Sequence, residues 1–120
     1  MKADNQILND SKLFALRIIR LYTYLCEEKG VKILSKQILR SGTSIGANVR
    51  ESVNAQSKMD FVNKLNIALK EANETEYWLE LIHESGFIND TQFESIYDNC
   101  GKLVATLIKI IKTTKANQKN

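Results

Sequence analysis

Glu80 and His83 are the two residues whose types and spacing best suit a metal or catalytic site. They form a Glu-x-x-His pattern in a stretch with helical periodicity, the arrangement with which helix bundles place two ligands of a di-iron centre on one face. Such a centre needs two of these patterns and two further glutamates, but His83 is the only histidine in the chain. Only a site shared across a symmetric contact between chains would satisfy that requirement. We therefore predict no metal and interpret His83 as a partly exposed side chain near a helix end.

Other groups that could carry chemistry are two cysteines and a series of glutamates. Cys26 and Cys100 are far apart in the sequence and each continues an apolar row, which favours buried reduced thiols over a redox pair. The glutamates recur along residues 71–84 as expected for a solvated or ion-paired helix face. No glycine-rich phosphate loop, CxxC pair or GxSxG motif occurs in the sequence. We predict that the protein is not an enzyme, has no catalytic residues and uses no cofactor.

Basic residues are better organised than these reactive groups. Those in residues 32–55 share one side of a predicted helix, and those in residues 90–114 line one side of another. Such stripes suit the phosphate backbone of RNA or DNA. Aromatic residues are not interleaved with them, so we expect contacts to phosphate rather than base stacking. The candidates are Arg17, Arg20, Lys36, Arg40, Arg50, Lys102, Lys109 and Lys112.

The charges are separated along the chain, which leaves an alternative open for these basic residues. The formal net charge is only +3. Residues 1–50 hold nine Lys or Arg and four Asp or Glu, residues 51–100 hold three and ten, and residues 101–120 hold five and none. The basic residues are therefore either a nucleic-acid surface, or solvated side chains that pair with the acidic third helix of a neighbouring subunit.

The elements that position these side chains are predicted to be four helices. Apolar residues recur in steps of three and four over about residues 10–28, 32–55, 58–85 and 90–114, and no stretch shows strand alternation. The chain has no proline, which favours long helices. We predict an all-α, antiparallel up-and-down four-helix bundle in a single domain spanning residues 1–120, with a frayed tail at residues 115–120.

The helix boundaries have recognisable capping residues. Ser57 with Asp60 three positions later is close to a capping box at the start of the third helix. Asn89 or Asp90 is predicted to cap the fourth helix. Glycines at 30 and 86 are expected to end the first and third helices.

The stretch RSGTSIGANVRES at residues 40–52 breaks the usual composition of a helix. Glycine in a helix costs about 1 kcal/mol relative to alanine, so Gly42 and Gly46 indicate a place where another helix crosses with its backbone very close. Asn48 would then lie among apolar neighbours, where its amide would fix the register of packing. We call Gly42, Gly46 and Asn48 the close-packing seam, and expect it to join copies of the bundle. The alternative is a weak helix with a kink at the glycines.

The sequence has no segment suited to a membrane. No run approaches the roughly 18 to 20 apolar residues that a span requires, and the N-terminus MKADNQILND lacks the apolar core of a signal peptide. We expect a cytoplasmic protein.

Nearly the whole sequence resembles a known family. The run TSIGANVRES, followed by SKMDFVNKLNIALKEANETEYWLELI and Gly86, is similar to the four-helix bundle proteins encoded in intervening sequences of bacterial large-subunit (23S) ribosomal RNA genes. The likeness extends from about Leu13 to Ile111 and includes a Ser-Ile-x-Ala-Asn signature with a glutamate three residues after the asparagine. Many members have proline at the position of Gly46, and Ala-Glu-Gly in place of residues 50–52.

The resemblance implies a bundle that assembles as a homopentamer and has no known enzymatic activity. Its relatives include accessory proteins of diversity-generating retroelements, which bind nucleic acid and a reverse transcriptase. We therefore expect a non-enzymatic homo-oligomer that binds RNA or DNA through its basic stripes. The alternative is a structural adaptor that binds a protein partner without nucleic acid.

Overall fold

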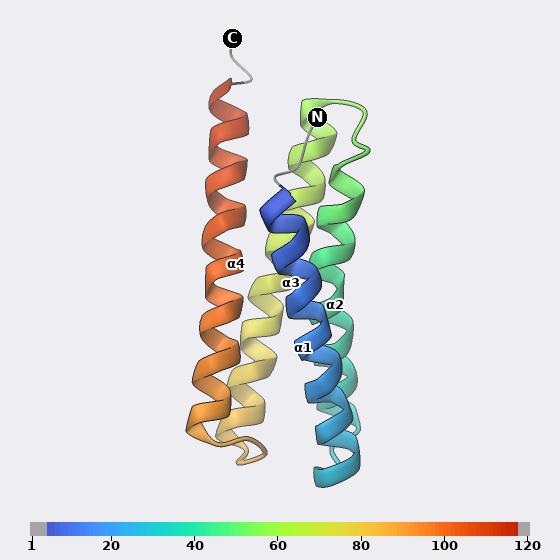
Figure 1. The fold of residues 1–120 in the computed structure, drawn as a ribbon, viewed down its shortest axis with the longest axis vertical. Helices are drawn as coiled ribbons and strands as arrows, with labels where there is room; N and C mark the ends of the chain where they lie inside the picture. The colour runs from blue at the N-terminus through green and yellow to red at the C-terminus, as the bar shows by residue number, and fades with distance from the viewer. Residues whose placement is uncertain (1–4, 118–120) are drawn as a thin grey trace.

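Four long helices make up the structure, a computed structural model in which residues 5–117 are described. They are α1 (Asn5–Lys29), α2 (Ile33–Ser52), α3 (Lys58–Glu84) and α4 (Asp90–Asn117). Successive helices run in opposite directions, as Figure 1 shows. The bundle measures 52 × 21 × 19 Å. No strand forms between residues 5 and 117, and the predicted all-α up-and-down bundle is confirmed.

Each helix packs against the next one along the chain, but the bundle is not closed evenly. The contacts of α2 with α1 and α3, and of α3 with α4, are extensive, whereas among neighbouring helices α1 and α4 have the least contact. The start of α1, the α2–α3 loop and the end of α4 lie at one end of the bundle (Figure 1). Residues far apart in the sequence therefore share that end.

The observed helix limits differ from the predicted ones by more than one residue at three places. The first helix begins five residues earlier than predicted, because Ile7 is fully buried and extends the apolar row that continues with Phe14. The second helix ends at Ser52, three residues before the predicted limit. The fourth continues to Asn117 through part of the tail that was predicted to fray, while residues 118–120 lie outside the described part.

Side chains cap the third and fourth helices as the sequence predicts. The hydroxyl of Ser57 accepts a hydrogen bond from the Asp60 amide at 3.0 Å. At the fourth helix, Asn89 and Gln92 each accept the other's backbone N–H at 2.8 Å, which is a complete capping box. These bonds satisfy amides that the first helical turn leaves without an intrahelical partner.

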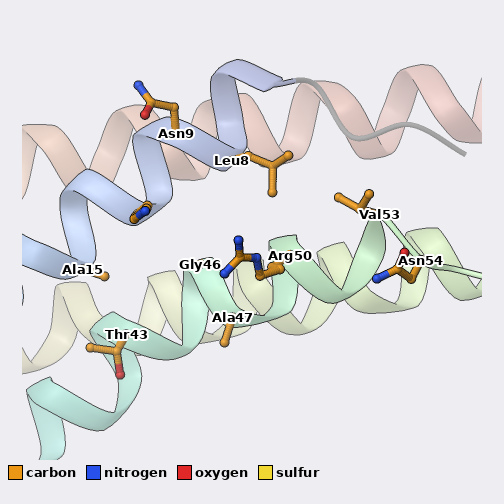
Figure 2. Close-up of a pocket in the computed structure, with 10 residues that line it drawn as sticks. Leu8, Asn9, Ala15, Thr43, Gly46, Ala47, Arg50, Val53 and Asn54 are labelled. Atoms are coloured by element: carbon orange, nitrogen blue, oxygen red, sulfur yellow. The ribbon is translucent and has the colours of Figure 1, made fainter.

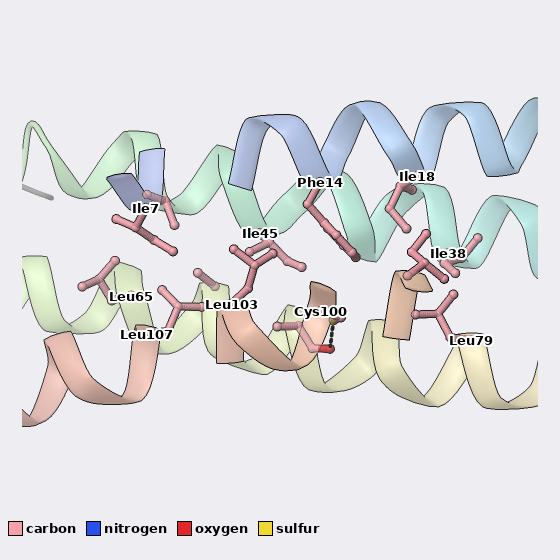
Figure 3. Packing of buried hydrophobic residues seen from close by; sticks show 14 of the residues in the cluster. Ile7, Phe14, Ile18, Ile38, Ile45, Leu65, Leu79, Cys100, Leu103 and Leu107 are labelled. Atoms are coloured by element: carbon pink, nitrogen blue, oxygen red, sulfur yellow. Dashed lines mark hydrogen bonds between the residues drawn. The ribbon is translucent and has the colours of Figure 1, made fainter. Parts of the chain in front are cut away.

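The core is a continuous apolar column along the bundle axis, filled from all four helices. Ile7, Leu65 and Leu107 lie near one end, and Ile18, Ile38 and Leu79 near the other (Figure 3). Large aliphatic side chains that leave water each contribute about 1.5 to 3 kcal/mol, so this column is the main source of stability.

A few small polar groups interrupt the column, and each has a partner. Thr75 donates a hydrogen bond to the hydroxyl of Ser41 at 2.9 Å, between α3 and α2. The thiol of Cys100 donates to the Ala72 carbonyl at 3.4 Å (Figure 3). Within residues 5–117, no buried side-chain nitrogen or oxygen lacks a hydrogen-bond partner.

The glycines of the close-packing seam lie where α1 crosses α2. A Cβ atom at Gly42 would lie 2.7 Å from Cγ1 of Ile18, and one at Gly46 would lie 3.3 Å from the backbone oxygen of Ser11. The helix runs without a break through both positions. The close contact is therefore made inside one chain, which corrects our expectation that it joins copies of the bundle.

Asn48 makes a local hydrogen bond. Its side-chain amide is partly buried and donates to the Ser44 carbonyl of its own helix at 2.8 Å. Its expected role in the register of packing stays a prediction.

Replacing Gly42 by leucine should destabilise the bundle by about 3 kcal/mol, because the new side chain has to displace Ile18 from a filled core. Ala47→Leu, one turn further on the exposed side of the same helix, should change stability by less than about 0.5 kcal/mol. Urea unfolding followed by circular dichroism measures both. Equal stability of the two variants would contradict a tight α1–α2 contact.

Candidate nucleic-acid interface

Three of the predicted nucleic-acid ligands form an exposed stripe on α4. Lys102, Lys109 and Lys112 all reach solvent, while Leu103, Leu107 and Ile111 on the opposite side anchor the helix in the core. The stripe spans roughly 15 Å of helix. Within residues 5–117 none of the three lysines makes an ion pair. Their charges are therefore available to an external anion.

The surroundings of the stripe are poor in acidic residues. Asp98 lies one turn before Lys102, and no acidic residue follows it in α4. Lys102 also borders a shallow hollow of about 230 Å³ between α1 and α4, which Asp10 lines as well. Asp10 and Asp98 therefore lie toward the Lys102 end of the stripe, and α4 itself has no carboxylate near Lys109 and Lys112.

Arg17 has a structural task that sequence reasoning missed. Its guanidinium donates to Oδ1 of Asn99 at 3.0 Å, and to the hydroxyl and carbonyl oxygens of Ser95 at 2.9 and 3.4 Å. These bonds join α1 to α4 on the side of the bundle where helix contact is least. Arg17 is partly buried and most of its donors are used inside the chain, so we remove it from the candidate interface.

Arg20 lies one turn after Arg17 and stays exposed. The two arginines border a hollow of about 410 Å³ between α1 and the start of α4, where Tyr24, Thr91 and Gln92 also lie. Arg20 therefore lies near the start of α4, whereas Lys109 and Lys112 lie near its end.

Arg40 is neutralised within the chain. It forms ion pairs with Glu71, at 3.5 Å, and with Glu74 on α3. Glu74 also accepts a hydrogen bond from the indole of Trp78 at 3.1 Å. Arg40 is 54% exposed, so these pairs contribute at most about 1 kcal/mol each, but they reduce its charge toward a distant phosphate.

Burial near this network shifts the pKa of one carboxyl group. The pKa of Glu71 is raised, mainly by burial and further by the neighbouring Glu74, although Arg40 partly opposes the change. The acidic third helix thus pairs with the basic second helix of its own chain. The sequence-based alternative had assigned this pairing to a neighbouring subunit.

Lys36 and Arg50 complete the predicted set on α2. Both are exposed and, among residues 5–117, neither makes an ion pair. Arg50 borders a groove of about 640 Å³ between α1 and α2, which Lys12 of α1 borders as well. Lys12 was not among the predicted site residues, because its place beside Arg50 depends on how the two helices pack.

The Glu-x-x-His pair does not form a ligand set. Glu80 accepts a hydrogen bond from the Tyr97 hydroxyl at 2.8 Å, whereas Nε2 of His83 lies 2.7 Å from Oδ1 of Asp90. The His83 ring also stacks on Phe93, with ring centroids 4.1 Å apart. No group of three potential metal ligands occurs within residues 5–117.

Tyr97 and Cys100 are held in their neutral forms beside the same carboxylates. The hydrogen bond to Glu80, together with burial, raises the pKa of Tyr97 to about 12. Burial, with a smaller effect of Glu76, raises the pKa of Cys100 to about 12. A thiol that stays protonated at neutral pH is a poor nucleophile, and the two cysteines are both free.

No helix within residues 5–117 combines the length and apolar character that crossing a membrane requires.

Arg17→Ala should destabilise the protein by about 1 to 2 kcal/mol, because three hydrogen bonds between α1 and α4 are lost. Arg20→Ala, the matched exposed arginine, should cost less than about 0.5 kcal/mol. Thermal denaturation at low protein concentration compares the two. If both variants unfold like the wild type, Arg17 is not a structural bridge and returns to the candidate interface.

Comparison with known proteins agrees with this geometry. The family model of the 23S rRNA-intervening sequence protein matches residues 3–109. The bundle is also similar to a crystal structure of a protein of unknown function from the S23 ribosomal protein family of Bacteroides thetaiotaomicron, with 55% sequence identity and a TM-score of 0.90. That match covers 92% of this chain and 98% of the other. No curated protein matches the chain. The resemblance noted in the sequence is confirmed, and the chain belongs to the 23S rRNA-intervening sequence protein family.

Proposed function

We propose that the chain, as a member of the 23S rRNA-intervening sequence protein family, is a non-enzymatic homo-oligomer that binds RNA or DNA through the lysines of α4. We also propose that the protein lies in the cytoplasm. Its contacts are to phosphates, and the binding carries little base sequence information. A homopentamer is the assembly that the family resemblance implies.

The observation that carries the proposal is the exposed stripe of Lys102, Lys109 and Lys112. Lysines that have no ion-pair partner within the described chain keep their full charge for an external polyanion, and neutralising each phosphate releases condensed counterions. Arg40, by comparison, is paired with glutamates. The large aromatic residues Phe14 and Phe61 are buried in the core, which supports phosphate contact without base stacking.

An apolar row on the outer side of α1 supports assembly. Leu13, Leu16 and Ile19 are spaced by three residues and are 53%, 42% and 44% exposed. Residues three apart on a helix are neighbours, so the three side chains form one apolar strip that faces away from the core. Covering such a strip with a second copy would remove it from water, and repeated lysine stripes on one assembly would act together at high effective concentration.

Charge reversal on α4 tests nucleic-acid binding. Lys109→Glu combined with Lys112→Glu should lower affinity for RNA and DNA of any sequence, and should reduce the slope of log affinity against log salt by about 1.4 to 1.8. Fluorescence anisotropy with labelled single-stranded and double-stranded oligonucleotides at 50 to 200 mM salt measures both quantities.

The control is Lys70→Glu, an exposed lysine on the outer side of α3, which should leave both the affinity and the salt slope nearly unchanged. Wild-type protein that binds no oligonucleotide at low salt, or binds independently of salt, would refute the nucleic-acid proposal.

Leu16→Arg tests the assembly separately. Its side chain points away from the core, so the variant should remain folded while the assembly dissociates toward the 13.7 kDa chain. Asn73→Arg adds the same charge to the exposed side of α3 and should leave the assembly intact. Light scattering at micromolar concentration gives the masses, and a wild-type protein with the mass of one chain would end this part of the proposal.

A further inference from the structure

A groove with a volume of about 640 Å³ lies between α1 and α2. The small residues that line it, which we call its floor, are Ala15 on α1 and Thr43, Gly46 and Ala47 on α2. Figure 2 shows these residues along the two helices, with Leu8 and Val53 near the α2–α3 loop. A floor without long side chains lets another backbone approach closely, as it does at helix interfaces with small residues.

The rim of the groove is positively charged. Lys12 borders it on α1 and Arg50 on α2. No acidic residue occurs among the described residues that line it, and neither cation makes an ion pair within residues 5–117. The side-chain amides of Asn9 and Asn54 add hydrogen-bond donors and acceptors. The groove therefore favours an anionic occupant.

The groove also carries exposed apolar surface. Val53 is 36% exposed and Leu8 is only partly buried. Together with Ala15 and Ala47 they add apolar surface to the groove that Lys12 and Arg50 border. A phosphate backbone would leave that apolar surface uncovered, whereas an amphipathic helix covers it with leucine-like side chains and sets acidic residues beside the rim.

We propose that the α1–α2 groove is a docking site for an acidic amphipathic helix of a partner protein. The apolar face of that helix lies on the small-residue floor and against Leu8 and Val53. Its carboxylates pair with Lys12 and Arg50, which fixes the orientation and accelerates the encounter. This inference does not depend on nucleic-acid binding, because it uses none of the three lysines on α4.

Two synthetic peptides test the proposal. One is a fluorescein-labelled amphipathic helix of about 18 residues, roughly five turns, with leucines on one face and glutamates beside them; the other has lysine in place of every glutamate. Anisotropy should show that the acidic peptide binds wild-type protein at least about ten-fold more tightly than the basic peptide. Amide chemical-shift changes should centre on Ala15, Gly46 and Ala47.

Three variants locate the binding. Lys12→Glu with Arg50→Glu should weaken the acidic peptide at least about ten-fold, and Ala47→Trp should do so by filling the floor while charge is unchanged. Lys70→Glu with Lys115→Glu makes the same change in net charge at exposed positions elsewhere and should preserve binding. Circular dichroism confirms that each variant is folded.

Several results would overturn the proposal. One is equal binding of the acidic and basic peptides, and another is binding that neither groove variant alters. A third is a wild-type protein that binds no acidic peptide but binds oligonucleotides and loses that binding on the Lys12→Glu, Arg50→Glu change, which would make the groove a phosphate site. A fourth is an assembly that dissociates on Ala47→Trp, which would mean that a second copy fills the groove. Failure of the α4 charge reversal alone would refute nucleic-acid binding and leave the peptide result intact.

Discussion

The close approach of α1 to α2 at Gly42 and Gly46 is the constraint on which the arrangement of the bundle depends. With no side chain at Gly42, Ile18 fills the space beside the α2 backbone, and α1 packs deeply on that side. The opposite side of α1 meets α4 with less contact, and Arg17 bridges it with hydrogen bonds instead. Gly42 and Gly46 lower the helix propensity of α2, and the tighter packing of α1 against α2 compensates for this loss.

The same packing decides which cations remain free. Antiparallel contact of α2 with α3 brings Arg40 to Glu71 and Glu74. The charge of Arg40 is therefore paired within the chain. No acidic residue follows Asp98 in α4, and within residues 5–117 the lysines after it make no ion pair. Pairing inside the chain therefore engages Arg40, whereas within residues 5–117 the lysines of α4 and the two cations at the rim of the α1–α2 groove make no ion pair.

These two surfaces differ in chemistry, although both are cationic. On α4 the charges stand on a stripe without exposed aromatic residues, which suits a polyanion that offers only phosphates. In the groove, Lys12 and Arg50 flank apolar and small side chains, which suits a protein helix. Membership of the family does not choose between them, because the similar protein from Bacteroides thetaiotaomicron is itself of unknown function.

The sequence by itself determined the elements and their inner faces. Apolar spacing, Ser57 and Asn89 as caps, and the glycines after α1 and α3 all depend on interactions within a few residues, so the four helices were predicted with small errors in their limits. Only the tertiary structure decided that the contact at Gly42 is made by α1 of the same chain, that Arg17 and Arg40 are engaged, and that Lys12 lies beside Arg50. Spacing along one helix defines which residues share a face, but the neighbour that covers that face is set by the packing of all four helices together.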